Sequence, residues 1–411
     1  MTQADKKPDV IPDVIIVGGG PAGMMAGMLL ARSGISTLVL EKHADFFRDF
    51  RGDTVHPSTM ELLSELGMLD RFLARPHHRL NGAEISWEGR LFKVADLSHL
   101  PTPAPFIAMM PQWDFLDFLR DEAAAFPAFQ LRMTAPVTGF IEEAGRIVGV
   151  TVAPGEDLRA GKLVLACDGR DSLVRGQQLL PVEDLGAPID VFWFAVPKPK
   201  QGHAVRGAIR GNHMIVQIDR GDYWQCAYVI TKGSAEAIRE RGIEAFRAEV
   251  RASAPQLENL ESALPDFSAV KLLSVSLDRL TRWHRPGLLA IGDAAHAMSP
   301  VGGVGINLAI QDAVATANLL AEPLTSAGHA NADDDLHRVQ DRRLLPTRVI
   351  QAGQRAAHES LLRPLISGEP EQRSEPPAFL KLLNRFAVLQ RLPARAIGLG
   401  FRREHLTAPK A

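Results

Sequence analysis

The stretch DVIIVGGGPAGMMAGMLLARSGISTLVLE, residues 13–41, decides the fold of this chain. It opens with a short apolar run at 13–17, which predicts a strand. Helix-forming Ala, Met and Leu follow over 22–33 up to Gly34, which suits a left-handed C-terminal cap. A second apolar run at 35–40 ends in Glu41. This strand–turn–helix–strand order predicts the start of a Rossmann-like, doubly wound parallel sheet in an α/β protein.

The turn between the first strand and the helix has the spacing G-x-G-x-x-G, formed by Gly18, Gly20 and Gly23. Side chains at the first two glycines would block a tight turn and the approach of a pyrophosphate to backbone N–H groups, while Pro21 and Ala22 begin the helix. A glycine-rich turn often only caps a helix. Strand, helix, second strand and terminal acid together favour a dinucleotide site.

The acid that ends the second strand is Glu41, followed by Lys42. A carboxylate in this place accepts hydrogen bonds from ribose hydroxyls and repels a 2′-phosphate. The site therefore suits an adenosine without a 2′-phosphate, but this stretch does not say which dinucleotide carries it.

Length and composition indicate a globular protein of two domains, or of one large domain with an elaborate insertion. Its 411 residues exceed what one core usually supports, and its net charge of −2 gives no reason to expect nucleic acid as a partner. The two cysteines exclude a disulfide framework, and no apolar run approaches the ~18 residues of a spanning helix. We expect a cytoplasmic monomer or homodimer without a stable membrane span.

A second glycine-rich run, IGDAAHAMSPVGGVGIN, occupies 291–307. A dinucleotide as long as FAD has a distant second end, and this run is able to hold it. Asp293 can accept from ribityl hydroxyls, and Gly303 and Gly305 lead into a helix from Ile306 and Asn307. The free N–H groups at the start of that helix can face the pyrimidine edge of a flavin, where negative charge gathers on reduction.

A third motif lies between these runs. DGRDSLVR, residues 168–175, follows a short apolar strand and has the pattern D-G-x-x-S-x-x-R. In this order the three runs resemble the single-component flavoprotein aromatic hydroxylases of the p-hydroxybenzoate hydroxylase type, over roughly the whole chain. The resemblance implies FAD as cofactor, NADH or NADPH and O₂ as co-substrates, and hydroxylation of a small aromatic or heteroaromatic molecule through a flavin C4a-hydroperoxide.

The resemblance also assigns residues to the cofactor. Arg51 is similar to the family's arginine near the FAD phosphates, and Gln112 to another FAD contact. Arg48 and Arg175 suit either the nicotinamide phosphates or surface ion pairs. Two departures are visible, Ala309 where many relatives have glycine and Ser299 where some have proline. The full expected cofactor set is Gly18, Gly20, Pro21, Ala22, Gly23, Glu41, Lys42, Arg51, Gln112, Asp168, Asp293, Gly303, Gly305, Ile306 and Asn307.

The nucleotide-binding domain recurs along the chain and is therefore discontinuous. We expect it at 1–75, 101–180 and 270–335, with a substrate domain of mixed β-sheet at 76–100 and 181–269 and a C-terminal helical segment at 336–411. One amphipathic helix is expected near 235–253. The basic, apolar end of the chain suits a membrane or a partner, although packing against the FAD domain is the simpler interpretation.

Catalytic residues are harder to choose. An aromatic hydroxylation gains from a base or acceptor beside the substrate. The candidates are His213, Gln217, Gln225 and Tyr228 on strands, and His56, with His213, Gln217 and His56 preferred for catalysis. Strand alternation places 213 and 217 on one face, although the sequence does not say whether that face meets the flavin. His296 is expected to be structural and bonded to backbone. No metal-ligand spacing is seen, so no metal is expected.

Two other functions stay open. One is another flavin oxidoreductase on the same fold, such as a reductase or an oxidative tailoring enzyme of natural-product biosynthesis. The other is a non-enzymatic FAD-binding protein.

Overall fold

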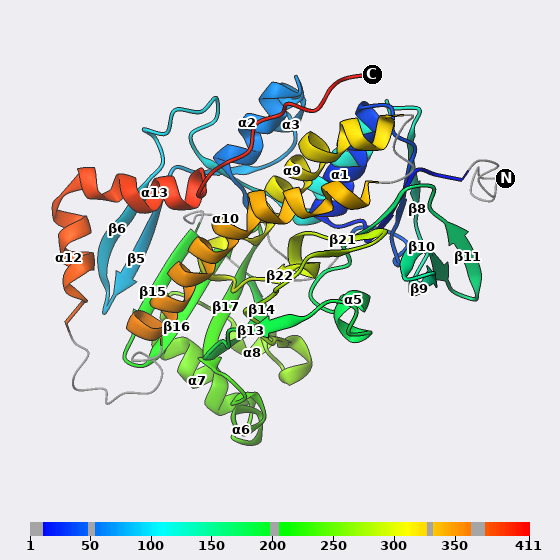
Figure 1. Ribbon diagram of the computed structural model, residues 1–411. Helices are drawn as coiled ribbons and strands as arrows, with labels where there is room; N and C mark the ends of the chain where they lie inside the picture. Colours follow the sequence, from blue (N-terminus) through cyan, green and yellow to red (C-terminus); the bar gives the residue numbers. More distant parts are fainter. Residues whose placement is uncertain (1–10, 48–53, 198–204, 327–331, 363–374) are drawn as a thin grey trace.

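Two large β-sheets organise the chain (Figure 1). The computed structural model describes residues 11–47, 54–197, 205–326, 332–362 and 375–411. The first sheet has six strands, and every neighbouring pair is parallel except β20 with β21. In spatial order the strands are β20 (His284–Arg285), β21 (Leu288–Ala290), β12 (Leu163–Ala166), β1 (Val14–Val17), β2 (Thr37–Leu40) and β8 (Phe129–Arg132). The α/β fold with a parallel sheet, predicted from 13–41, is confirmed.

Helix α1 (Pro21–Arg32) packs between the first sheet and two further helices, α4 (Gln112–Ala123) and α9 (Gly305–Thr325). It is therefore buried on nearly every side, which explains why its composition is apolar throughout rather than amphipathic. The chain leaves it through Gly34, whose φ of +79° gives the left-handed cap predicted from the sequence.

The helix α9 and the residues before it, Val301–Thr325, form the one described helix long and apolar enough to cross a membrane by composition. Most of it is buried inside the protein, with 78% of the apolar window covered. Beside it runs α10 (Leu336–Ala357), which packs on α9 and extends toward the second sheet in the view of Figure 1.

The second sheet has seven strands and is antiparallel except where β15 pairs with β5. In spatial order these are β18 (Lys271–Leu273), β14 (Ile189–Pro197), β17 (Tyr223–Thr231), β16 (His213–Asp219), β15 (Val205–Arg210), β5 (Gly82–Trp87) and β6 (Arg90–Asp96). Because β18 belongs to this sheet, the second sheet continues slightly beyond residue 269.

The two faces of the second sheet have different neighbours. On one face Ile215 and Tyr228 pack with Phe246 of α7. On the other face Met214, Val229 and Val301 lie in one apolar cluster, and Val301 belongs to the glycine-rich run at 291–307. Period-two alternation along β16 and β17 therefore separates a helix-covered face from a face turned toward that run.

Smaller elements complete the fold. Three three-stranded sheets are present: β3 (Thr54–Val55), β7 (Ile107–Met109) and β4 (His78–Leu80); β9 (Val137–Glu143), β10 (Arg146–Val152) and β11 (Glu156–Arg159); and β13 (Val182–Asp184), β19 (Asp278–Leu280) and β22 (His296–Ala297). The shorter helices are α2 (Pro57–Glu65), α3 (Leu69–Leu73), α5 (Leu173–Gly176), α6 (Ala235–Glu240), α7 (Ile243–Ser253), α8 (Leu260–Ala263), α12 (Ala378–Arg385) and α13 (Arg391–Gly398).

The single helix expected near 235–253 is two helices in the structure, α6 and α7. Gly242 separates them with a φ of +85°, a conformation that ends one helix and redirects the chain into the next. At the other end of the molecule, α12 covers the edge strand β6, where Asn384 accepts a hydrogen bond from the backbone N–H of Lys93 (3.2 Å). The C-terminal helices thus pack chiefly on the second sheet, while residues 402–411 pack back on the first domain.

Candidate functional site

The first glycine turn closes tightly against the neighbouring strand β12. Gly18 has a φ of +103°, and a Cβ atom on it would lie 2.5 Å from the carbonyl oxygen of Cys167. A Cβ on Gly23 would lie 2.0 Å from the carbonyl oxygen of Gly18. Around Gly20 the space is open, with no described atom within 4 Å of a Cβ there. Two glycines therefore serve close packing, and the third leaves room in front of the α1 N-terminus.

Glu41 lies beside this turn at the end of β2. Its Oε2 accepts a hydrogen bond from the backbone N–H of Gly19 (3.0 Å), and its Oε1 accepts one from the backbone N–H of His43 (3.1 Å). Burial raises the pKa of Glu41, but hydrogen bonds from His43 and Gly19 outweigh it and the pKa is lowered overall. The carboxylate is held ionised next to the turn, and the neighbouring Lys42 is exposed.

Asp168 follows β12 and adjoins the same turn, since a Cβ on Gly18 would be 2.9 Å from the Asp168 Cα. Its Oδ2 accepts from the backbone N–H of Leu173 (2.8 Å). Its Oδ1 is buried and has no hydrogen-bond partner among the described residues. Burial raises the pKa of this carboxyl. A buried acceptor without a protein partner is a group that a bound ligand can satisfy.

Two arginines of the middle motif reach the turn at 292–295. Arg175 donates from Nε to the carbonyl oxygen of Ala294 and from Nη2 to that of Asp293, both at 3.0 Å, and it forms an ion pair with Asp278. Arg170 donates to Oδ2 of Asp293 (3.3 Å). Of the two earlier alternatives for Arg175, these contacts favour ion pairing, and they join the second motif to the third.

The third motif also touches the first. Gly292 has a φ of +60°, and a Cβ on it would lie 3.0 Å from the Cβ of Ala22 and 3.2 Å from that of Ala309. Ala309 therefore fits against Gly292, and this contact does not require a glycine at position 309. The side chain of Asp293 is about one-third exposed, at 32%. Gly18 is close to Asp168. Arg170 and Arg175 bind the turn at Asp293, and Gly292 packs on Ala22. The three runs therefore converge in space.

The loop before α9 turns through Gly302 (φ +83°) and Gly303 (φ +64°), and the helix begins at Gly305 and Ile306. Asn307 secures the first turn, because its Oδ1 accepts hydrogen bonds from Ser58 and Thr59 of α2, both at 2.8 Å. The first turn of α9 contains no acidic residue. Its N-terminal backbone amides thus present positive potential without a nearby carboxylate of their own helix.

His56 links this loop to the C-terminal helices. It is fully buried, with Nε2 2.9 Å from the carbonyl oxygen of Gly303 and Nδ1 2.8 Å from that of Ile397. Burial lowers the pKa of His56, although both carbonyl contacts oppose the shift. A neutral imidazole has one N–H and donates to one of these carbonyls at a time. The contacts describe a residue that positions the loop.

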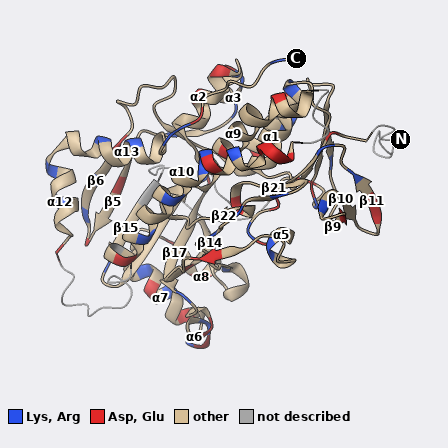
Figure 2. Cartoon of the chain, in the orientation of Figure 1, with Lys and Arg blue, Asp and Glu red and all other residues tan. Residues whose placement is uncertain are grey.

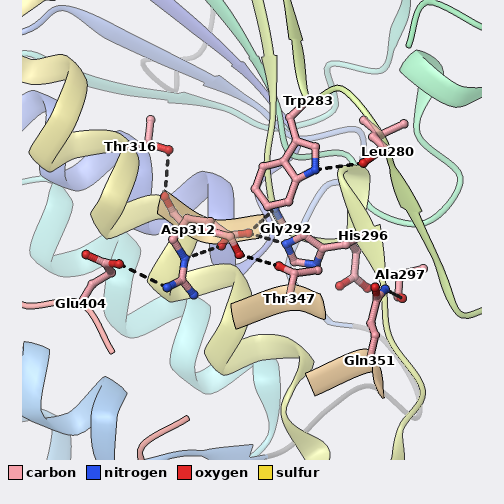
Figure 3. A network of polar contacts seen from close by, with 12 residues as sticks. Leu280, Trp283, Gly292, His296, Ala297, Asp312, Thr316, Thr347, Gln351 and Glu404 are labelled. Carbon is pink, nitrogen blue, oxygen red and sulfur yellow. Dashed lines mark hydrogen bonds and ion pairs between the residues drawn. The ribbon is translucent and has the colours of Figure 1, made fainter. Parts of the chain in front are cut away.

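A buried polar network lies behind the turn at Gly292 (Figure 3). Oδ2 of Asp312 accepts from the Gly292 backbone N–H (3.1 Å) and lies 2.6 Å from Nε2 of His296. Oδ1 of Asp312 accepts from Nε of Arg343 (2.9 Å), whose Nη1 is 3.2 Å from Glu404. His296 is thus structural, as expected, but its partner is a carboxylate rather than backbone. Since the four ionisable side chains are at most 4% exposed, the network fixes the turn rigidly.

The other predicted residues fall into two groups. Gln112 begins α4 and is half-buried, whereas Arg51 and Arg48 lie outside the described residues.

His213 and Gln217 share one face of β16, as alternation requires, and it is the face covered by α7. There Nδ1 of His213 is 2.5 Å from the hydroxyl of Tyr228. Their catalytic assignment stays a prediction, and the structure does not bring them together with Gly303 or Asp293.

The opposite face carries Gln225, another of the strand candidates expected from the sequence. Gln225 of β17 is 4% exposed, its Oε1 accepts from Nε of Arg220 (2.8 Å), and its Nε2 has no hydrogen-bond partner among the described residues. Burial lowers the pKa of Arg220 to about 10. Asp312, Arg343 and Glu404, by contrast, were not anticipated from the sequence. The sequence offers one signal for them: Asp312 lies within the apolar run of α9, and an isolated buried charge needs a partner.

These observations define a class of protein. Open space in front of Gly20, an unpartnered buried oxygen on Asp168, the carboxylate of Glu41 and the α9 N-terminus together suit an extended, doubly charged dinucleotide. The residues present therefore fit FAD, and the fold is that of an FAD-binding protein.

Comparison with known proteins identifies the family. Residues 12–352 match the FAD binding domain family. A 6-methylpretetramide 4-monooxygenase of Streptomyces rimosus is 34% identical over 317 residues, covering 76% of each chain. A rifampicin monooxygenase of Streptomyces venezuelae is 29% identical, with 73% of this chain and 62% of that protein covered. The chain belongs to the FAD-dependent flavoprotein monooxygenases of the aromatic hydroxylase type.

A solved structure shares the fold. The crystal structure of PqsL, a probable FAD-dependent monooxygenase from Pseudomonas aeruginosa, superposes with a TM-score of 0.73 at 22% identity. The match covers 87% of this chain and 99% of that one. The fold is therefore shared over most of this chain.

Proposed function

We propose that this protein is an NAD(P)H-dependent FAD monooxygenase that uses O₂ to hydroxylate an aromatic or heteroaromatic small molecule. The observation that carries the proposal is the convergence of the turns at Gly18, Asp168 and Asp293. The curated relatives are named as monooxygenases of 6-methylpretetramide and rifampicin. On that basis we propose a substrate of the natural-product class.

In this proposal each turn holds a different part of FAD. The turn at Gly18–Gly23 and Glu41 receive the pyrophosphate and the adenosine ribose, with Lys42 nearby. The carboxylates of Asp168 and Asp293 accept hydrogen bonds from the ribityl part. When bound, FAD supplies the redox and oxygen-activating chemistry, and the protein supplies binding and orientation.

The α9 N-terminus is assigned to the flavin ring. The backbone amides of Gly305 and Ile306 lie at the N-terminus of a 21-residue helix, and the first turn of this helix has no acidic residue. Such a terminus stabilises a nearby negative charge by about 0.3–1 kcal/mol at an exposed site and by up to about 2 kcal/mol when partly buried. His56 and Asn307 contribute by holding the loop and the first turn in place.

The substrate is assigned to the face of the second sheet opposite α7. Met214, Val216, Ala227 and Val229 present apolar side chains there, in one cluster with Val301 of the glycine-rich loop. An apolar wall suits an aromatic ring and excludes water from the reaction.

Gln225 lies on the same face. Because Arg220 donates to its Oε1, the Nε2 group remains as a donor. We propose that this group binds a substrate oxygen. The earlier candidates His213 and Gln217 stay proposals for catalysis, although their side chains lie on the α7 side of the sheet.

The proposal is tested by following NAD(P)H oxidation, O₂ consumption and product formation with a panel of aromatic compounds. Hydroxylated product coupled to both co-substrates supports it. Substrate reduction without O₂ uptake favours a reductase on the same fold, and a lack of nicotinamide oxidation under all conditions favours a non-enzymatic FAD-binding protein.

A further inference from the structure

The C-terminal helices carry an unusual outer surface. Residues 378–398 comprise α12, the turn Ala387–Gln390 and α13, and we call their outward side the C-terminal face. Five large apolar side chains on it are exposed: Phe379 (46%), Leu382 (50%), Phe386 (49%), Val388 (68%) and Leu392 (68%). Single exposed apolar residues are ordinary, but five within fourteen residues form a patch that requires an explanation.

The inner side of the same helices is already packed. Leu380 is buried with Trp87 and Phe92 of the second sheet. Ala394 is buried with Leu97 and Leu100, near which Gly398 makes a close approach. The helices are therefore anchored by one side, and the exposed apolar residues are not needed for that packing.

Charge on this segment has one sign. Between Ala378 and Arg403 the sequence has six basic residues and no acidic one. The whole chain has 46 basic and 48 acidic residues, which leaves 40 basic and 48 acidic, a net −8, elsewhere. Figure 2 shows α12 and α13 with blue but no red segments, at the edge of the molecule.

The cations lie among the apolar side chains. Lys381, Arg385, Arg391 and Arg395 are all exposed. Lys381 pairs with Glu375, just before α12. In the described part of the chain, no ion pair joins Arg385 or Arg395 to a carboxylate. Basic and apolar side chains thus share one outward side of a surface helix pair.

This combination decides between two occupants. A second copy of the chain meeting the same face by two-fold symmetry would place arginines against arginines, which is unfavourable. An anionic lipid surface satisfies both features, since the cations attract lipid phosphates while Phe and Leu enter the interfacial region. We infer that the C-terminal face docks this enzyme peripherally on an anionic membrane.

The docking is an interfacial one. Both helices lie on the protein surface with one side packed on the second sheet, so neither crosses the bilayer. Each Lys or Arg that reaches an anionic surface strengthens binding roughly five-fold at low salt. The attraction weakens at high salt because the Debye length falls from about 10 Å at 0.1 M to about 3 Å at 1 M.

Sedimentation with vesicles tests the inference. The FAD-loaded full-length chain is mixed with sucrose-loaded vesicles of phosphatidylcholine alone or of phosphatidylcholine with phosphatidylglycerol. We expect partitioning onto the anionic vesicles to exceed that onto neutral ones by roughly ten-fold or more, and to fall as salt is raised. The double variant Val388→Glu with Leu392→Glu is expected to lose this binding and to keep the flavin.

The matched control is the double variant Leu345→Glu with Val349→Glu on α10, which adds the same two charges at exposed apolar side chains (49% and 40%) outside the C-terminal face. It is expected to bind vesicles like the unmodified chain. Equal binding by the Val388→Glu and Leu392→Glu double variant, or no preference for anionic vesicles at low salt, overturns the inference. A concentration-dependent dimer that this variant abolishes assigns the face to a second copy and also overturns it.

Discussion

Asp312 and His296 meet behind the turn at Gly292, with Oδ2 of the carboxylate 2.6 Å from Nε2 of the imidazole and both side chains at most 1% exposed. The same carboxylate oxygen accepts the backbone N–H of Gly292. A charged group in the core of α9 is thus what fixes the backbone beside Asp293. Removal of this group is expected to affect both stability and cofactor retention.

Asp312→Asn is expected to lower the free energy of unfolding by up to about 3–5 kcal/mol, because the buried guanidinium of Arg343 loses one of its two carboxylate partners and keeps only Glu404. Urea unfolding followed by circular dichroism measures the change. As a control, Glu143→Gln removes an exposed pair with Arg159 and is expected to leave the unfolding midpoint unchanged. Equal midpoints for Asp312→Asn and the unmodified chain would contradict the role of the network.

The same residue predicts a pH dependence. Burial raises the pKa of Asp312, but the charges and hydrogen bonds of His296 and Arg343 outweigh it, and the pKa is lowered overall. The resulting stabilisation is complete above the unfolded-state pKa of about 3.9 and is lost as pH falls through the lower folded-state pKa. The stability difference between the unmodified chain and Asp312→Asn should therefore be constant near neutral pH and shrink below about pH 4. A difference that grows on acidification would contradict it.

Gly18 and Gly20 are expected to respond differently to alanine. Gly18→Ala forces a Cβ to 2.5 Å from a carbonyl at a φ of +103°, so it should destabilise the fold by at least about 1–3 kcal/mol. Gly20 has a φ of −73° and open space, so Gly20→Ala should fold normally and bind FAD more weakly.

Thermal melts of the apoprotein and flavin fluorescence titrations separate these two effects. Gly353→Ala, at an open position in α10, is the control and should alter neither FAD affinity nor folding adversely. Normal FAD affinity in Gly20→Ala would mean that the space before α1 is not the pyrophosphate site.

Gln225→Leu is expected to raise KM for the aromatic substrate roughly ten-fold, since one hydrogen bond to an uncharged group is worth about 0.5–1.5 kcal/mol and the unpaired partner costs more. FAD affinity should be unchanged. Steady-state kinetics with His213→Ala provide the comparison, because His213 lies on the α7 side and its loss is expected to spare KM. If His213→Ala loses turnover with FAD still bound, the proposed catalytic role of His213 is supported.

Local pattern predicted the first sheet well. The apolar runs at 13–17 and 35–40 and the short apolar strand before residue 168 correspond to β1, β2 and β12, since buried parallel strands have continuous apolar sequences. The break at Gly242 was missed because an amphipathic period continues across it. The sheet of β9, β10 and β11 was missed because its outer strands β9 and β11 are mostly half-buried or exposed and lack a clear alternation.

The site was predicted in its backbone parts and less well in its side chains. Glycine spacing depends on local backbone conformation, so the turns at Gly18 and Gly292 could be predicted from the sequence. The sidedness of β16 depends on which face α7 covers, which is a tertiary property that alternation alone does not contain. Arg343 reaches Asp312 from a distant segment, and Glu404 reaches Arg343 from another, so no local sequence pattern predicts either contact.

Flavin titration of paired variants tests the central claim most directly, because Asp293 and Gly20 are far apart in sequence and are proposed to hold one FAD molecule. The account predicts that the unmodified chain binds equimolar FAD and that Asp293→Ala and Gly20→Ala each weaken that single site while the apoproteins stay folded. The account is contradicted if the purified chain is colourless and does not bind FAD on reconstitution. It is also contradicted if neither substitution changes the FAD affinity.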